Sequence, residues 1–66
     1  MSPERRSTFA AQLAAARRHL GLTQRNVAAG VGYDSNTVAR WERGERTPHV
    51  STQKMVLAWL AQQRAR

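Results

Sequence analysis

A short segment of the chain carries polar side chains that can each make paired hydrogen bonds. If residues 35–43 form a helix, successive side chains turn by about 100°. The face opposite Val38 and Trp41 then carries Asn36, Ala39, Arg40 and Arg43. An asparagine amide can hold the N6 and N7 edge of adenine, and an arginine guanidinium can hold the O6 and N7 edge of guanine. We therefore predict that this face enters the major groove of a nucleic-acid duplex.

Other residues near this face are candidates for less specific contacts. Ser35 can bond a base or a phosphate, and Ala39 allows close approach or contact with a thymine methyl group. The predicted base-reading residues are therefore Asn36, Arg40, Ser35 and Ala39. Charged and hydroxyl side chains around the face can reach phosphates, and the predicted set includes Arg25, Tyr33, Thr37, Arg43 and Arg46. For the arginines, simple solvation at the surface is the alternative.

Capping and breaker residues divide the chain into helices, and no stretch has the alternating pattern of a strand. Ser2-Pro3-Glu4, or alternatively Ser7, can begin the first helix. Thr47 with Pro48, or alternatively Ser51, can begin a last helix over about residues 48–63. We predict an all-α fold with four helices, or five, in one compact domain that spans the whole chain.

The segment Leu22–Gly44 is predicted to hold two helices joined through a glycine. Thr23 and Asp34 are the predicted caps of these helices, which span about residues 24–31 and 35–43. Helices joined by so short a turn must cross steeply, which requires a small contact point and a left-handed turn. The residues that supply these are Ala28 and Gly32. The predicted apolar seam consists of Val27, Val31, Val38 and Trp41.

The composition excludes several classes of function. The chain has 66 residues, a formal net charge of +7, ten arginines, one lysine and no cysteine. The cationic surplus favours a polyanionic partner, because clustered cations release counterions from a phosphate backbone. Four carboxylates, two distant histidines and no thiol form no triad, acid pair or metal cluster. We expect no enzyme activity, no metal and no cofactor.

The hydrophobic pattern bears on location and on ligands. The longest uncharged run is too short to span a bilayer, and the basic start lacks the apolar stretch of a signal peptide. We expect a cytoplasmic protein with no membrane partner, held at the nucleoid by DNA. So small a domain is expected to have no room beside its core for a pocket of ~300 Å³, so no small-molecule ligand is expected.

The segment Leu22–Gly44 resembles the helix-turn-helix of the lambda-repressor, Cro and xenobiotic-response-element family. A narrower likeness is to the DNA-binding domain of MqsA-type antitoxins and to related small phage regulators, such as anti-CRISPR-associated autorepressors. The residues that carry it are Asn36, Arg40-Trp41-Glu42, Gly44, Pro48-His49 and Ser51-Thr52. The resemblance implies base reading by Asn36 and Arg40, backbone contact by Gln24, and dimeric binding to a palindrome. It also implies an ion pair between Arg17 and Glu42 that fixes the angle of the recognition helix.

The chain departs from this family at Gly30, Tyr33 and the last helix. Gly30 lies inside a predicted helix, where it should cost roughly 0.5–1 kcal/mol against alanine. Family members usually continue into a fifth helix, which the sequence does not predict here. The last helix instead carries an apolar arc of about 240°, whereas one core needs little more than ~100°. We predict a homodimer through Val56, Leu57, Trp59, Leu60 and Ala61; exposure of Leu57 and Ala61 on a monomer is the alternative.

Together these features predict a sequence-specific, dimeric transcriptional regulator that binds an inverted repeat in double-stranded DNA. Repression of its own promoter is the predicted mode. An antitoxin-like or protein-interaction module of a larger assembly is the main alternative, although the lack of cysteines disfavours a zinc-binding, toxin-neutralising part. RNA binding is a further alternative, which competition by duplex RNA would test.

Overall fold

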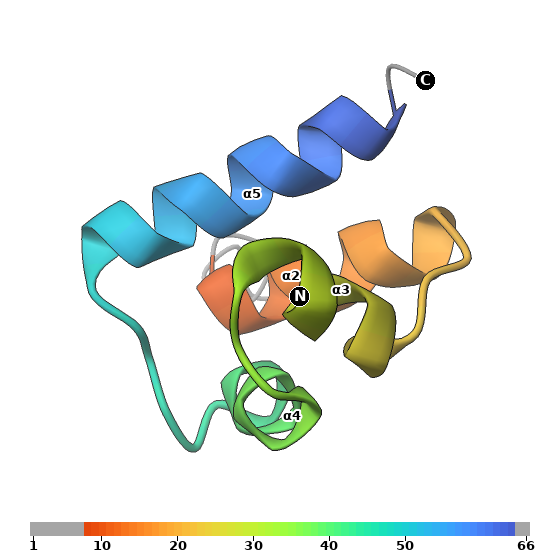
Figure 1. Ribbon diagram of the computed structural model, residues 1–66. Helices are drawn as coiled ribbons and strands as arrows, with labels where there is room; N and C mark the ends of the chain where they lie inside the picture. The colour runs from red at the N-terminus through yellow and green to blue at the C-terminus, as the bar shows by residue number, and fades with distance from the viewer. Residues whose placement is uncertain (1–7, 65–66) are drawn as a thin grey trace, which may run out of the picture.

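The computed structural model describes residues 8–64, which fold into four helices with no strand (Figure 1). The helices are α2 (Phe9–His19), α3 (Gln24–Val31), α4 (Ser35–Arg43) and α5 (Val50–Arg64). The all-α prediction is confirmed for this part of the chain, and α3 and α4 have the predicted bounds. The helix starts predicted at Ser2-Pro3-Glu4 and Ser7 lie outside the described residues.

Side-chain caps begin the first three of these helices. Thr8 Oγ1 accepts a hydrogen bond of 3.2 Å from a backbone N–H in the first turn of α2. Thr23 Oγ1 accepts from the Asn26 N–H at 2.9 Å, while Asn26 Oδ1 accepts from the Thr23 N–H at 2.9 Å. Asp34 Oδ1 accepts from the Thr37 N–H at 2.7 Å. These bonds satisfy N–H groups that have no partner within the helix, so the predicted caps Thr23 and Asp34 are confirmed.

The connection between α3 and α4 turns sharply at Gly32. The φ angle of Gly32 is +83°, in the left-handed region that residues with a Cβ atom rarely adopt. The backbone N–H groups of Gly32 and Tyr33 both donate to the Ala28 carbonyl oxygen at 2.9 Å. This turn lets α4 cross α3 and pack against it, as the sequence predicts.

One apolar core holds the helices together. Its buried residues are Phe9, Leu13, Val27, Ala28, Val31, Val38, Trp41, Val56 and Leu60. The Trp41 ring lies at the centre of an aromatic group, with centroids 6.0 Å from Phe9 and 4.9 Å from Tyr33. The α4 and α5 helices each pack against α2 and α3, and they lie on opposite sides of the molecule (Figure 1). The fold therefore leaves the outer face of α4 uncovered by the rest of the described chain.

The start of α5 differs from both predicted positions. The helix begins at Val50, and the residue before it, His49, uses its ring in place of the predicted Thr47 or Ser51 hydroxyl. The His49 Nδ1 accepts from the Ser51 N–H at 3.2 Å, and it lies 3.0 Å from the Ser51 Oγ. The predicted caps are wrong because the helix starts between them: Ser51 lies inside its first turn, Thr47 lies three residues before it, and the position directly before Val50 is occupied by His49.

The apolar arc of α5 is largely used within the chain itself. Val56 and Leu60 are 0% and 1% exposed, so their predicted place in a dimer interface is wrong: they offer a partner no surface. Leu57 and Trp59 are half-buried and pack against the same core. Of the predicted interface residues, only Ala61 is exposed. Contact with both α2 and α3 covers a wider arc than contact with one neighbour would.

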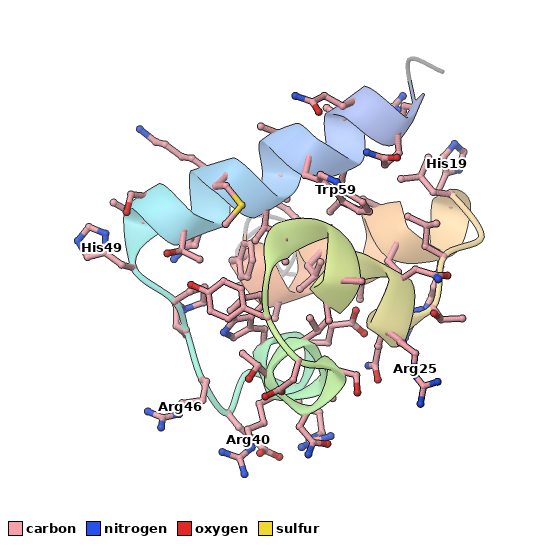
Figure 2. The ribbon with its side chains drawn as sticks, in the orientation of Figure 1. His19, Arg25, Arg40, Arg46, His49 and Trp59 are labelled. Atoms are coloured by element: carbon pink, nitrogen blue, oxygen red, sulfur yellow. The ribbon has the colours of Figure 1, made fainter. Side chains whose placement is uncertain are left out.

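The glycine inside α3 has a packing role that the sequence alone does not reveal. A Cβ atom built on Gly30 would overlap the indole ring of Trp59 on α5, and the Trp59 Cη2 would lie only 2.8 Å away. Trp59 projects from α5 toward α3 (Figure 2). The absence of a side chain at Gly30 is therefore what lets the Trp59 ring pack closely against α3.

Candidate nucleic-acid interface

The outer face of α4 brings together the predicted base-reading residues. Val38 and Trp41 are buried and fix the rotation of the helix about its axis. Asn36, Arg40 and Arg43 are exposed on the opposite side, at positions spaced by about one turn. The half-buried residues Ser35 and Ala39 flank this stripe. The side chains thus form one continuous polar strip along an exposed helix.

Three arginines from different elements project from the same side of the molecule as α4. Arg25 lies on α3, Arg40 on α4 and Arg46 in the loop after α4. Figure 2 shows all three side chains extending away from α5. No carboxylate within residues 8–64 lies in ion-pair distance of any of the three. Unpaired cations gathered on one side make this surface attractive to a polyanion.

The orientation of α4 is fixed by an ion pair to α2. Arg17 Nε donates to Glu42 Oε2 at 2.6 Å, and Arg17 Nη2 donates to Glu42 Oε1 at 2.9 Å. The third nitrogen, Nη1, donates to the Leu22 carbonyl oxygen at 3.0 Å. The two side chains are only 15% and 7% exposed. The pair that the resemblance implies is therefore formed, and it joins α2, the chain before α3, and α4 at one point.

Gln24 takes part in the same network. Its Nε2 donates to Glu42 Oε1 at 3.1 Å, so the Glu42 carboxylate accepts hydrogen bonds from two residues. The resemblance implies contact between Gln24 and the DNA backbone. In this structure the amide nitrogen of Gln24 is directed at Glu42, and it ties the start of α3 to the end of α4.

The pKa of Glu42 lies below its ordinary value of 4.5. Burial raises this pKa, but the hydrogen bonds from Arg17 and Gln24, together with the positive charge of Arg17, lower it by more. A carboxyl group with a depressed pKa in the folded state binds fewer protons than in the unfolded state. The network therefore stabilises the fold fully above about pH 4.5 and progressively less at lower pH.

We expect the free energy of unfolding to fall as the pH is lowered from about 4.5 through the folded-state pKa of Glu42. The Glu42→Gln variant should lose less stability over the same range, because it has no proton to bind at this position. Urea unfolding at pH 7, 4 and 3 would measure both. Since Asp34 and Glu45 also have lowered pKa values, some dependence remains in the variant. An equal fall in the two proteins would contradict the assignment.

Arg43 and Glu45 form a second ion pair, which the sequence analysis missed. Arg43 Nε donates to Glu45 Oε2 at 2.6 Å, and Nη2 donates to Oε1 at 3.3 Å. The side chains are 57% and 53% exposed. Opposite charges on both sides of the glycine that ends α4 are the sequence signal that would have indicated this pair. Arg43, predicted as a free phosphate contact, thus carries a carboxylate beside it.

A hollow of about 360 Å³ lies between α4 and the loop that leads to α5. Its polar lining includes Tyr33, Thr37, Arg40, Arg46, His49 and Thr52. The expectation that the chain has no room for a pocket near 300 Å³ is therefore wrong, because the extended loop stands away from α4. Tyr33 packs its ring edge on Trp41 and remains partly exposed beside Thr37, so both predicted phosphate contacts line this hollow.

Within residues 8–64 there is no group of three or more histidine, cysteine, aspartate or glutamate side chains that would hold a metal ion. None of the helices in this part of the chain is long and apolar enough to cross a membrane.

The helices and the polar strip on α4 lie in a region that matches a known protein family. The model of a family described as a helix-turn-helix domain matches residues 8–64, which include α2 through α5. Among curated proteins and solved structures, no match was found. The matched region contains the capped pair α3 and α4, the sharp turn at Gly32 and the polar strip on α4. The chain belongs to this helix-turn-helix domain family, whose members bind DNA.

Proposed function

We propose that this protein is a sequence-specific regulator of transcription that places α4 in the major groove of double-stranded DNA. The observation that carries the proposal is the exposed strip on α4, which presents Asn36 and Arg40 one turn apart on a helix anchored by the Arg17–Glu42 pair. Asn36 is proposed to read an adenine, and Arg40 a guanine. The short side chains of Ser35 and Ala39 let the backbone of α4 approach the bases.

Phosphate contacts are proposed to hold the helix in the groove. Arg25 and Arg46 lie on the two sides of α4, and both project in the same direction as Arg40 (Figure 2). In this arrangement one arginine meets each of the two backbones that border a major groove. Tyr33, Thr37 and the second amide hydrogen of Gln24, whose first bonds Glu42, are proposed as neutral donors to the same phosphates.

The protein is further proposed to bind an inverted repeat as a homodimer. Helix-turn-helix dimers occupy half-sites one DNA turn apart, near 34 Å, and this doubles the number of bases that a small domain reads. With Val56 and Leu60 committed to the core and Trp59 packed against Gly30 of α3, the interface on α5 is proposed to use Leu57 and Ala61, which lie on the same flank of the helix. Such a dimer would bury less of α5 than the sequence pattern suggests, so its stability would depend strongly on concentration.

Repression of its own promoter is the regulatory mode that we propose. A dimer bound across a promoter blocks polymerase by occupancy alone, and dimerisation makes that occupancy depend on protein concentration. An origin in a phage or other mobile element is proposed together with this mode. A reporter driven by the protein's own promoter should fall in activity when the protein is supplied from a second plasmid. An unchanged reporter would remove the proposal of autorepression.

Substitutions on α4 and in the following loop should have different effects on DNA binding. Arg40→Ala is expected to cost about 1–3 kcal/mol of discrimination at one guanine, and Asn36→Ala a similar amount at one adenine. Arg46→Ala should instead weaken binding to all sequences alike and lower the salt slope by about one. Titration against an operator and its single-base variants would separate these effects. If Arg40→Ala weakened specific and random DNA equally, Arg40 would be a phosphate contact.

A further inference from the structure

The Arg43–Glu45 pair lies at the end of the polar strip on α4. Arg43 is the last residue of the helix and shares the exposed face of Asn36 and Arg40. Gly44 then turns the chain with a φ angle of +76°, and the Glu45 N–H donates to the Arg40 carbonyl oxygen at 3.0 Å. The backbone of Glu45 is thus fixed by the helix end itself. Its carboxylate is brought beside the Arg43 guanidinium by that turn.

The carboxylate occupies one particular edge of the guanidinium. An arginine side chain has five N–H donors in a fixed planar fork. Glu45 accepts from Nε and from one hydrogen of Nη2, at 2.6 Å and 3.3 Å. The edge formed by Nη1 and the second hydrogen of Nη2 stays open among the described residues. That open edge offers two parallel donors, which is the geometry that the O6 and N7 atoms of guanine accept.

A role in phosphate binding fits this pair poorly. The carboxylate cancels the charge of Arg43, so the pair as a unit adds almost nothing to counterion release from DNA. It would also repel a phosphate close to the guanidinium. Arg25 and Arg46 have no such carboxylate among the described residues, and Arg40 forms no ion pair there, although Asp34 and Glu45 lie near enough for its charge to lower their pKa values. The negative charge instead suits an arginine whose acceptor is uncharged, because the carboxylate can hold the guanidinium without repelling that acceptor.

We propose that Arg43 reads a guanine in the major groove and that Glu45 is the positioning residue that holds its fork in the reading orientation. This inference rests on the proposed function, and it moves Arg43 from the phosphate contacts to the base-reading residues. It adds a third specified base in each half-site, beyond those assigned to Asn36 and Arg40. Glu45 itself makes no contact with DNA.

The test is selection of bound sequences from a random DNA pool, followed by titration of single-base variants, for the wild-type protein and three variants. Arg43→Ala should abolish a guanine preference of about 5- to 150-fold at one position per half-site. Glu45→Ala should reduce the preference at that same position, while binding to random duplexes becomes tighter and the salt slope rises by about one. Glu45→Gln, which keeps an acceptor oxygen but not the charge, should retain more of the preference than Glu45→Ala.

Other outcomes would overturn the inference. If Arg43→Ala weakens all sequences alike, Arg43 is a phosphate contact. If Glu45→Ala tightens binding to all sequences and leaves base discrimination unchanged, Glu45 acts only by charge. A wild-type protein that selects no sequence would refute the proposed function as well, whereas selection at the Asn36 and Arg40 positions alone would refute only the role of Arg43. Circular dichroism checks folding, which these exposed side chains should not affect.

Discussion

Replacing Arg17 by alanine should lower the free energy of unfolding by about 3 kcal/mol. The Glu42 carboxylate is only 7% exposed in the wild-type structure, and the variant leaves it with Gln24 as its remaining side-chain donor. A chain of 66 residues has a total stability of only about 3–10 kcal/mol. The loss should therefore leave a large unfolded fraction at moderate temperature. Urea unfolding followed by circular dichroism at 222 nm measures it.

The neighbouring Arg18 provides a matched control for this prediction. Arg18 is exposed on the same helix and forms no ion pair within residues 8–64, so Arg18→Ala should change stability by less than about 0.5 kcal/mol. A double variant, Arg17→Met with Glu42→Leu, removes both charges and should recover part of the loss. If Arg17→Ala costs no more than Arg18→Ala, the pair does not anchor α4.

Replacing Gly30 by alanine should destabilise the protein by about 2 kcal/mol, although alanine is the better helix former. In an open helical position the substitution would stabilise by roughly 0.5–1 kcal/mol. Here the new Cβ atom overlaps the indole ring of Trp59, which must move away and give up its contact with α3. Tryptophan fluorescence should shift to longer wavelength as the ring becomes more exposed. Thermal and urea unfolding give the size of the effect.

The control for this prediction is the same Gly30→Ala substitution made in a protein that lacks the Trp59 ring. In a Trp59→Leu protein the ring that causes the overlap is absent, so Gly30→Ala should be neutral or stabilising by up to about 1 kcal/mol. The sign of the effect should thus depend on Trp59. If Gly30→Ala stabilises the wild-type protein, the close packing of α3 against α5 is not as described.

Local signals explain why the helix-turn-helix could be predicted from the sequence. Thr23 and Asp34 cap α3 and α4 through bonds to residues three positions later, and Gly32 turns the chain within the same short span. Each signal is complete within a few residues, so no knowledge of the fold is needed to identify it. The seam residues followed from helical spacing alone, and Val38 and Trp41 are buried as predicted.

Features that depend on residues far apart in the sequence, or on the orientation of one side chain, could not be predicted in the same way. The start of α5 depends on the His49 ring, which caps a helix only in one orientation. The sequence indicated only that Gly30 is unfavourable inside a helix. Its packing role could not be predicted, because its partner Trp59 lies 29 residues later and on another helix. Periodicity correctly marked a wide apolar arc on α5 but not the number of its neighbours. Because α2 and α3 both cover it, less of that arc remains for a partner.

In the candidate site, too, local features could be predicted from the sequence and contacts between elements could not. Spacing along α4 predicted which residues share the exposed face, because that face follows from the burial of Val38 and Trp41. It did not indicate that Glu45 would fold back on Arg43, since this contact depends on the turn at Gly44. The Arg17–Glu42 pair was implied only by resemblance, and the bonds that Gln24 and the Leu22 carbonyl add to it were not predicted.

Selection of bound duplexes from a random pool is the most direct test of whether α4 reads a DNA sequence. The solution mass of the protein would be measured in parallel. We expect enrichment of an inverted repeat with half-sites about one helical turn apart, bound by a protein with the mass of a dimer. Enrichment should be lost at one position when Arg40 is replaced by alanine. A pool that stays unenriched, with a monomeric protein, would contradict the account.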